Sequence, residues 1–110
     1  MINKSQIVFL IEQLNKIIEI MEGENESNWI RAMKIIKNHL AETVTSNEVN
    51  EIENLKAAFD IWRGIHAGNG SFADFYIWRD DFNERESQNL NFENIKKNIW
   101  EAFRKFGFEA

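Results

Sequence analysis

Residues 7–21 read IVFLIEQLNKIIEIM, and this stretch decides the class of fold. Large apolar residues recur in it three and four positions apart, with charged residues between them, which is typical of a helix that packs one face against a core. We expect Ser5 to cap this helix and Gly23 to end it. The face expected to be buried comprises Ile7, Leu10, Ile11, Leu14, Ile17, Ile18 and Met21.

Two more helices are expected before residue 65. Ser27 offers an N-cap for the first, and Thr45 with Glu48 matches a capping box that opens the second, which should stop near Gly64. The first of these helices should form an antiparallel hairpin with the helix over residues 7–21. The residues expected to be buried are Trp29, Met33, Ile36 and Leu40 in the first, and Val49, Ile52, Leu55, Phe59 and Trp62 in the second.

The C-terminal third combines a clear helix with an ambiguous segment. Ser71 with Asp74 resembles a helix start, but the aromatic and β-branched run over residues 75–78, FYIW, fits a short strand equally well. Gly107 is a natural stop for the last helix. The apolar face of that helix is expected to comprise Phe92, Ile95, Ile99, Phe103 and Phe106.

Length and composition agree with a helical domain. The chain has 110 residues, of which 44% are hydrophobic, and it contains no proline, so nothing interrupts long helices. We therefore predict an all-α fold with residues 1–110 as a single domain. We expect a compact bundle of about five helices, in which the segment around 75–78 is either helical or a short extended stretch.

Charge and the absence of cysteine narrow the classes of partner. Thirteen basic and eighteen acidic residues give a net charge of −5, which disfavours nucleic acid and anionic membranes and favours a basic protein partner. Without cysteine there is no disulfide and no thiolate metal site, and two histidines leave little for another kind of metal site. We expect no metal, no cofactor and no membrane association. The apolar run at residues 7–11 is too short for a signal peptide or a membrane span, so we expect a cytoplasmic protein.

A serine, a histidine and an aspartate lie within residues 64–74, which raises the question of catalysis. Their local order matches no nucleophile motif, and the spacing of Ser71 and Asp74 is explained by a helix cap. We therefore predict that His66, Ser71 and Asp74 do not form a catalytic group and that the protein is not an enzyme. The residues assigned to a structural turn and cap are Gly68, Gly70, Ser71 and Asp74.

The densest acidic cluster follows the aromatic run of residues 75–78. It fits no EF-hand, so a solvated face is favoured over a metal site. An aromatic side chain beside carboxylates suits a protein interface, and alternate residues of the aromatic run should face inward. The predicted partner-binding residues are Tyr76, Trp78, Asp80, Asp81, Glu84 and Glu86. The alternative is the acidic stretch of Glu42, Glu48, Glu51 and Glu53.

Two segments are similar to one group of bacterial proteins. Residues 68–74, GNGSFAD, and residues 91–100, NFENIKKNIW, resemble the glycine–serine turn and the closing helix of small immunity proteins from contact-dependent growth inhibition and polymorphic toxin systems. The resemblance implies a small cytosolic inhibitor without catalytic activity. Such a protein binds one cognate toxin domain, here expected to be basic and to form a 1:1 complex, and it covers the active site of the toxin.

Alternatives remain for the kind of toxin that is bound and for the general class of this protein. A nuclease, with a ribonuclease favoured, suits an acidic inhibitor because phosphate-binding clefts are basic. The competing interpretation is a general helical interaction or adaptor domain without a toxin partner, which would need an apolar groove rather than charge complementarity.

Overall fold

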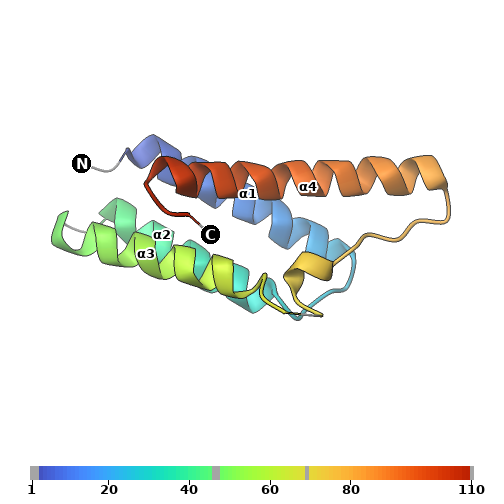
Figure 1. Cartoon of the computed structure of the whole chain (residues 1–110), viewed down its shortest axis with the longest axis horizontal. Helices are drawn as coiled ribbons and strands as arrows, with labels where there is room; N and C mark the ends of the chain where they lie inside the picture. The colour runs from blue at the N-terminus through green and yellow to red at the C-terminus, as the bar shows by residue number, and fades with distance from the viewer. Residues whose placement is uncertain (1–2, 46–47, 69, 110) are drawn as a thin grey trace.

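Among the residues that the structure describes, the regular structure consists of four α-helices and one short 3-10 helix (Figure 1). The computed structural model describes residues 3–45, 48–68 and 70–109, without the side chains of residues 48 and 49. The all-α prediction is confirmed: no strand occurs in this described part, and four α-helices with a 3-10 turn are close to the expected five. The elements are α1 (Lys4–Gly23), α2 (Ile30–Thr45), α3 (Glu48–Gly64), the 3-10 helix η1 (Phe72–Asp74) and α4 (Phe82–Lys105).

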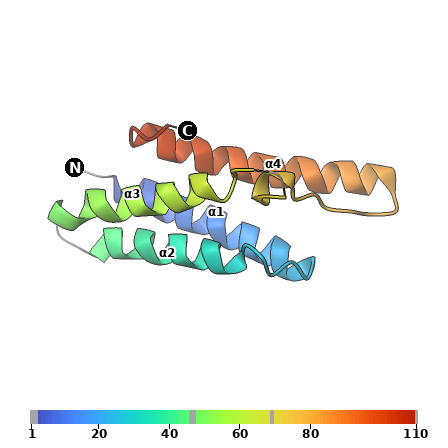
Figure 2. The same cartoon turned by 60° about the horizontal axis from the view of Figure 1, so that its bottom comes forward.

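The helices pack in chain order and α4 closes the fold. α1 packs against α2, α2 against α3, and α4 returns along α1 (Figures 1 and 2). With 24 residues, α4 is about 36 Å long at the usual helical rise. The molecule is accordingly elongated, 49 × 25 × 23 Å. Within the described residues, no helix combines the length and hydrophobicity that crossing a bilayer requires.

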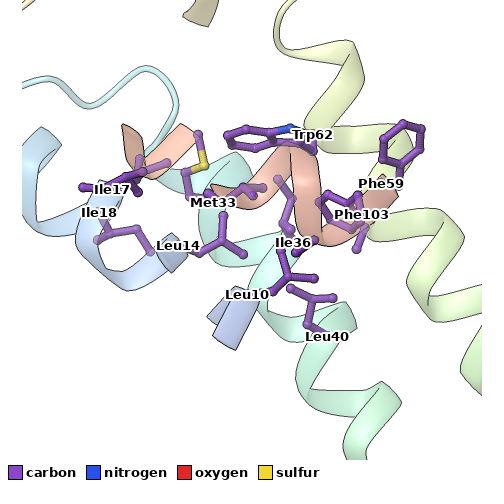
Figure 3. Close-up of a cluster of buried hydrophobic side chains, with 14 of the residues drawn as sticks. Leu10, Leu14, Ile17, Ile18, Met33, Ile36, Leu40, Phe59, Trp62 and Phe103 are labelled. Carbon is purple, nitrogen blue, oxygen red and sulfur yellow. The ribbon is translucent and has the colours of Figure 1, made fainter. Parts of the chain in front are cut away.

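One hydrophobic cluster receives side chains from all four α-helices (Figure 3). The predicted apolar faces of α1, α2 and α4 supply most of it, including Leu10, Ile36 and Phe103. Ile52 was wrongly placed in the core: its side chain is 57% exposed, because α3 turns its buried face along Leu55, Ala58, Phe59 and Trp62 instead. The prediction for Val49 lies outside the described side chains.

The N-terminal helix caps differ from the sequence expectation. Asn3, not Ser5, caps α1, since its side chain accepts a hydrogen bond from the Ser5 amide at 2.9 Å. α2 begins at Ile30, beyond the predicted Ser27 cap, and the Trp29 carbonyl accepts its first helical bond from Met33. Thr45 belongs to the last turn of α2, where its hydroxyl donates to the Ala41 carbonyl. The Glu48 half of the predicted capping box lies outside the described side chains.

The ends of α1 and α4 have the same hydrogen-bond pattern with different residues. After α1, Asn25 adopts a left-handed conformation (φ 58°) and Glu26 donates to the Met21 carbonyl. After α4, Gly107 (φ 98°) is the residue in the left-handed conformation. Gly107 therefore ends its helix as predicted, whereas at α1 the left-handed residue is Asn25 and Gly23 is still helical.

An aromatic cluster fills the space where α2, α3, η1 and α4 meet. Phe72 is its centre, with ring centroids 5.8 Å from Trp29, 5.9 Å from Trp62 and 5.7 Å from Phe92. Trp62 is fully buried, and Trp29 and Trp100 pack against the core from its edge. Trp29 and Trp62 were both predicted to be buried; Trp62 is, whereas Trp29 is only partly buried.

Candidate partner-binding site

The segment from Phe75 to Arg79 crosses from η1 to the start of α4 as an extended chain that is neither helix nor strand. Its side chains alternate: Ile77 is buried, and Tyr76 and Trp78 point outward. The Asn89 side chain holds this segment to α4, because it accepts from the Ile77 amide at 2.9 Å and donates to the Ile77 carbonyl at 2.8 Å. A single side-chain amide thus makes the hydrogen bonds that a neighbouring strand would otherwise make.

Four large apolar side chains lie exposed around this segment and on the first turns of α4. Tyr76 is 57% exposed, Trp78 61%, and Phe82 and Leu90 62% each. Contiguous exposed aromatic surface is uncommon on a protein that works alone and marks interaction sites. Tyr76 and Trp78 were predicted for the site; Phe82 and Leu90 were not. Their shared exposure could have been suspected only from the helix start at Phe82, because the two residues lie eight positions apart and so fall on the same side of a helix.

Arg85 organises two of the exposed rings. Its guanidinium lies over Trp78 at 4.3 Å and over Phe82 at 5.3 Å from the ring centroids. It also donates to the Arg79 carbonyl at 3.3 Å. The two rings are therefore presented on a fixed cationic support, which lowers the entropy lost when a partner binds them.

The four predicted carboxylates serve different local purposes. Asp81 is the N-cap of α4, since it accepts from the Glu84 amide at 2.8 Å, and Glu84 itself lies 3.4 Å from the Arg79 guanidinium. Asp80 accepts a long bond of 3.4 Å from the Trp78 indole, and Glu86 is exposed. Asp80 and Glu86 are thus the two carboxylates least committed to the protein's own structure. No group of three or more metal-ligating side chains gathers among the described residues.

Arg79 ties the site to the far end of α1. Its guanidinium donates to both oxygens of Glu24, at 2.8 and 2.7 Å, in a forked geometry. The hydrogen bond from Arg79 holds the pKa of the Glu24 carboxyl below its ordinary value, although partial burial opposes this. The same pair raises the pKa of Arg79. Both groups therefore stay charged, and the contact joins residues 55 positions apart.

The predicted turn residues surround η1. Gly68 and Gly70 both have positive φ, 83° and 73°, which favours glycine. Ser71 is the N-cap of η1, where its hydroxyl oxygen accepts from the Ala73 amide at 3.2 Å. Asp74 accepts from the Gly70 amide at 2.7 Å.

His66 is packed into the aromatic cluster, away from Ser71 and Asp74. Its Nδ1 lies 2.7 Å from the Trp62 carbonyl, and its Nε2 is buried without a partner among the described residues. Neither ring nitrogen is therefore bonded to the serine or the aspartate. Burial lowers the pKa of His66. The three residues considered for a triad make separate local contacts.

The carboxylates of the alternative acidic stretch lie in different surroundings from one another. Glu51 is buried and lies 3.9 Å from Lys4. Glu42 and Glu53 line a polar hollow of about 350 Å³ beside α2 and α3. The Glu48 side chain lies outside the described part. Large exposed aromatics accompany the carboxylates in the 76–90 region and not in this stretch.

Comparisons with known proteins do not indicate a function for this chain. No protein-family model, no curated protein and no solved structure matches this chain. Inference about function therefore rests on the exposed aromatic rings and carboxylates of residues 76–90, which we call the 76–90 surface.

Proposed function

We propose that this protein binds a basic protein partner through the 76–90 surface, and that the partner is a bacterial toxin domain which the protein neutralises as an immunity protein. The observation that carries the proposal is the group of Tyr76, Trp78 and Phe82, each more than half exposed and bordered by carboxylates. Aromatic anchors surrounded by charge are characteristic of interface hot spots.

Net charge supports the choice of a basic partner. A charge of −5 raises the rate of encounter with a positively charged cleft, and aromatic contacts slow dissociation. A nuclease active site, ribonuclease favoured, is such a cleft, and covering it would stop the toxin without any catalysis. The resemblance of residues 68–74 and 91–100 to immunity proteins supports the same choice.

The proposal predicts that a basic toxin domain is encoded beside this chain's gene, and the experiment uses the product of that neighbouring gene. Isothermal titration calorimetry should give a 1:1 complex, and the affinity should fall as salt rises. If this neighbouring domain is a toxin and no complex forms, the proposal is wrong.

Charge-reversal variants locate the surface. Asp80→Lys with Glu86→Lys should weaken binding by about tenfold or more, since each reversal turns an attraction into a repulsion. Asp81 is left intact because it caps α4. The matched control is Glu12→Lys with Glu19→Lys on α1, which changes the net charge equally at exposed positions elsewhere. Equal weakening by both pairs would move the contact away from the 76–90 surface.

One observation favours the competing adaptor function. A groove of about 290 Å³ between α1 and α4 is lined by Phe9 and Ala102 with polar neighbours, and Phe9 is exposed. A partner helix could bind there by apolar contacts. Binding that hardly changes with salt and is lost in Phe9→Ser, but not in Trp78→Ala, would support this function instead.

A further inference from the structure

A pocket of about 370 Å³ opens beside Tyr76, at the edge of the 76–90 surface. It lies between the loop after α1 and the turn around η1, two segments far apart in the sequence. Its lining residues are Glu26, Trp29, Gly70, Ser71, Asp74, Phe75 and Tyr76. Three of these are aromatic and two carry carboxylates, so the pocket combines ring faces and edges with negative charge.

The aromatic walls are held in place by the core. The rings of Trp29 and Phe75 meet edge to face with centroids 6.1 Å apart. Both also pack against the buried Phe72, at 5.8 and 6.5 Å. Tyr76 is exposed and forms the outer side. A ligand would therefore meet a preformed site, which reduces the cost of binding.

The two carboxylates have backbone partners but no cationic ones. Glu26 accepts from the Asn28 amide at 2.9 Å and Asp74 from the Gly70 amide at 2.7 Å. Within the part of the chain that the structure describes, neither makes an ion pair. Glu24, two residues before Glu26, is by contrast neutralised by Arg79.

We infer that this pocket receives an arginine side chain of the protein partner. The inference rests on the proposed function and adds the chemistry that the partner must present. A cation over an aromatic face beside carboxylates is stabilised by both, and a planar guanidinium can stack on a ring while its N–H groups reach carboxylate oxygens. The protein makes both contacts internally, with Arg85 over Trp78 and Arg79 on Glu24.

A short peptide tests the pocket without the partner. The probe is acetyl-Gly-Arg-Gly-amide, and its control replaces arginine by citrulline, which keeps the shape and removes the charge. In titrations followed by ¹H–¹⁵N correlation NMR, the arginine peptide should change the chemical shifts of the Trp29 indole N–H and the Tyr76 amide, and these changes should saturate. The citrulline peptide should bind about tenfold more weakly. Equal binding of the two peptides, or shifts that spread over the acidic surface without saturating, would overturn the inference.

Paired variants locate the cation. Glu26→Gln with Asp74→Asn keeps a carbonyl oxygen for each backbone hydrogen bond but removes both charges, and should weaken peptide binding about tenfold. Glu22→Gln with Glu19→Gln removes two exposed charges from α1 and should leave the affinity unchanged. If both pairs of variants weaken the peptide equally, only general charge attraction is at work and the pocket is not the site.

The two proposals can fail separately. Specific peptide binding without any complex with the neighbouring toxin-like domain would retain the pocket and exclude the proposed function. A toxin complex that Glu26→Gln with Asp74→Asn leaves at full affinity would retain the function and exclude the pocket as its arginine site.

Discussion

Two groups of aromatic residues in this protein differ in what surrounds them. Trp62, Phe72 and Phe92 are completely buried and contact one another and their neighbours ring to ring. Trp78 and Phe82 lie outside, in contact with the cationic Arg85. The inner group can stabilise the fold because its rings leave water, and the outer group keeps most of its apolar area available to a partner.

Removing one tryptophan from each group should separate these roles most strongly. Trp62→Ala should lower the free energy of unfolding by about 3–5 kcal/mol, because it empties a fully buried site. Trp78→Ala should lower it by about 0.5 kcal/mol or less, because the side chain is mostly exposed. Urea unfolding followed by circular dichroism measures both. Similar losses in the two variants would contradict the division.

The Asn89 side chain holds the outer segment to α4, and its removal should loosen that segment. Asn89→Ala leaves the amide and carbonyl of Ile77 without their partners and should cost about 1–3 kcal/mol. Hydrogen exchange at the Ile77 amide should become faster, and Trp78 should become more mobile. Asn91→Ala changes an exposed asparagine of the same helix and serves as the control. An unchanged exchange rate at Ile77 would mean that the outer segment is held by other contacts.

A smaller effect on stability, dependent on pH, should come from His66, which packs against Trp62 and Phe72 of the inner group. Burial lowers its pKa, the hydrogen bond to the Trp62 carbonyl opposes this, and the nearby charge of Lys96 lowers the pKa further. The unfolded chain therefore takes up a proton near pH 6.5 while the folded protein does not. The contribution to stability is complete above about pH 6.5 and is lost as the pH falls through the lower pKa of the folded state, with a slope of at most about 1.4 kcal/mol per pH unit.

His66→Phe should remove this part of the pH dependence, because a phenyl ring keeps the aromatic packing and does not titrate. The measurement is the difference in free energy of unfolding between wild type and variant from about pH 7.5 to about pH 5. Carboxylate titration is common to both proteins and cancels in the difference. A difference that does not change with pH would show that His66 is equally easy to protonate in both states.

The sequence predicted the interior better than the exterior. The spacing of Leu10, Leu14 and Ile17 was enough to assign the buried face of α1, because helical periodicity is a local property of the chain. The same reasoning failed for Ile52, which has helical spacing but lies on the outer face of α3. Periodicity allowed either face there, and the packing of α3 decided between them.

The elements of the 76–90 surface were partly visible in the sequence. Tyr76 and Trp78 could be placed outward once alternation along the run was assumed, and the carboxylates could be counted. Their separate tasks could not be predicted: the capping by Asp81 depends on where α4 begins. The support that Arg85 gives to Trp78 likewise requires the position of the chain relative to α4.

By itself, the sequence determined the helical class, the apolar faces of most helices, the acidic charge and the glycine-rich turn before η1. These follow from residue spacing and backbone preference over a few neighbouring positions. Only the tertiary structure decided that Glu24 meets Arg79, and that Glu26 and Trp29 lie across a pocket from Asp74 and Tyr76. Such contacts join residues about fifty positions apart, so they depend on how whole helices pack and not on any local pattern.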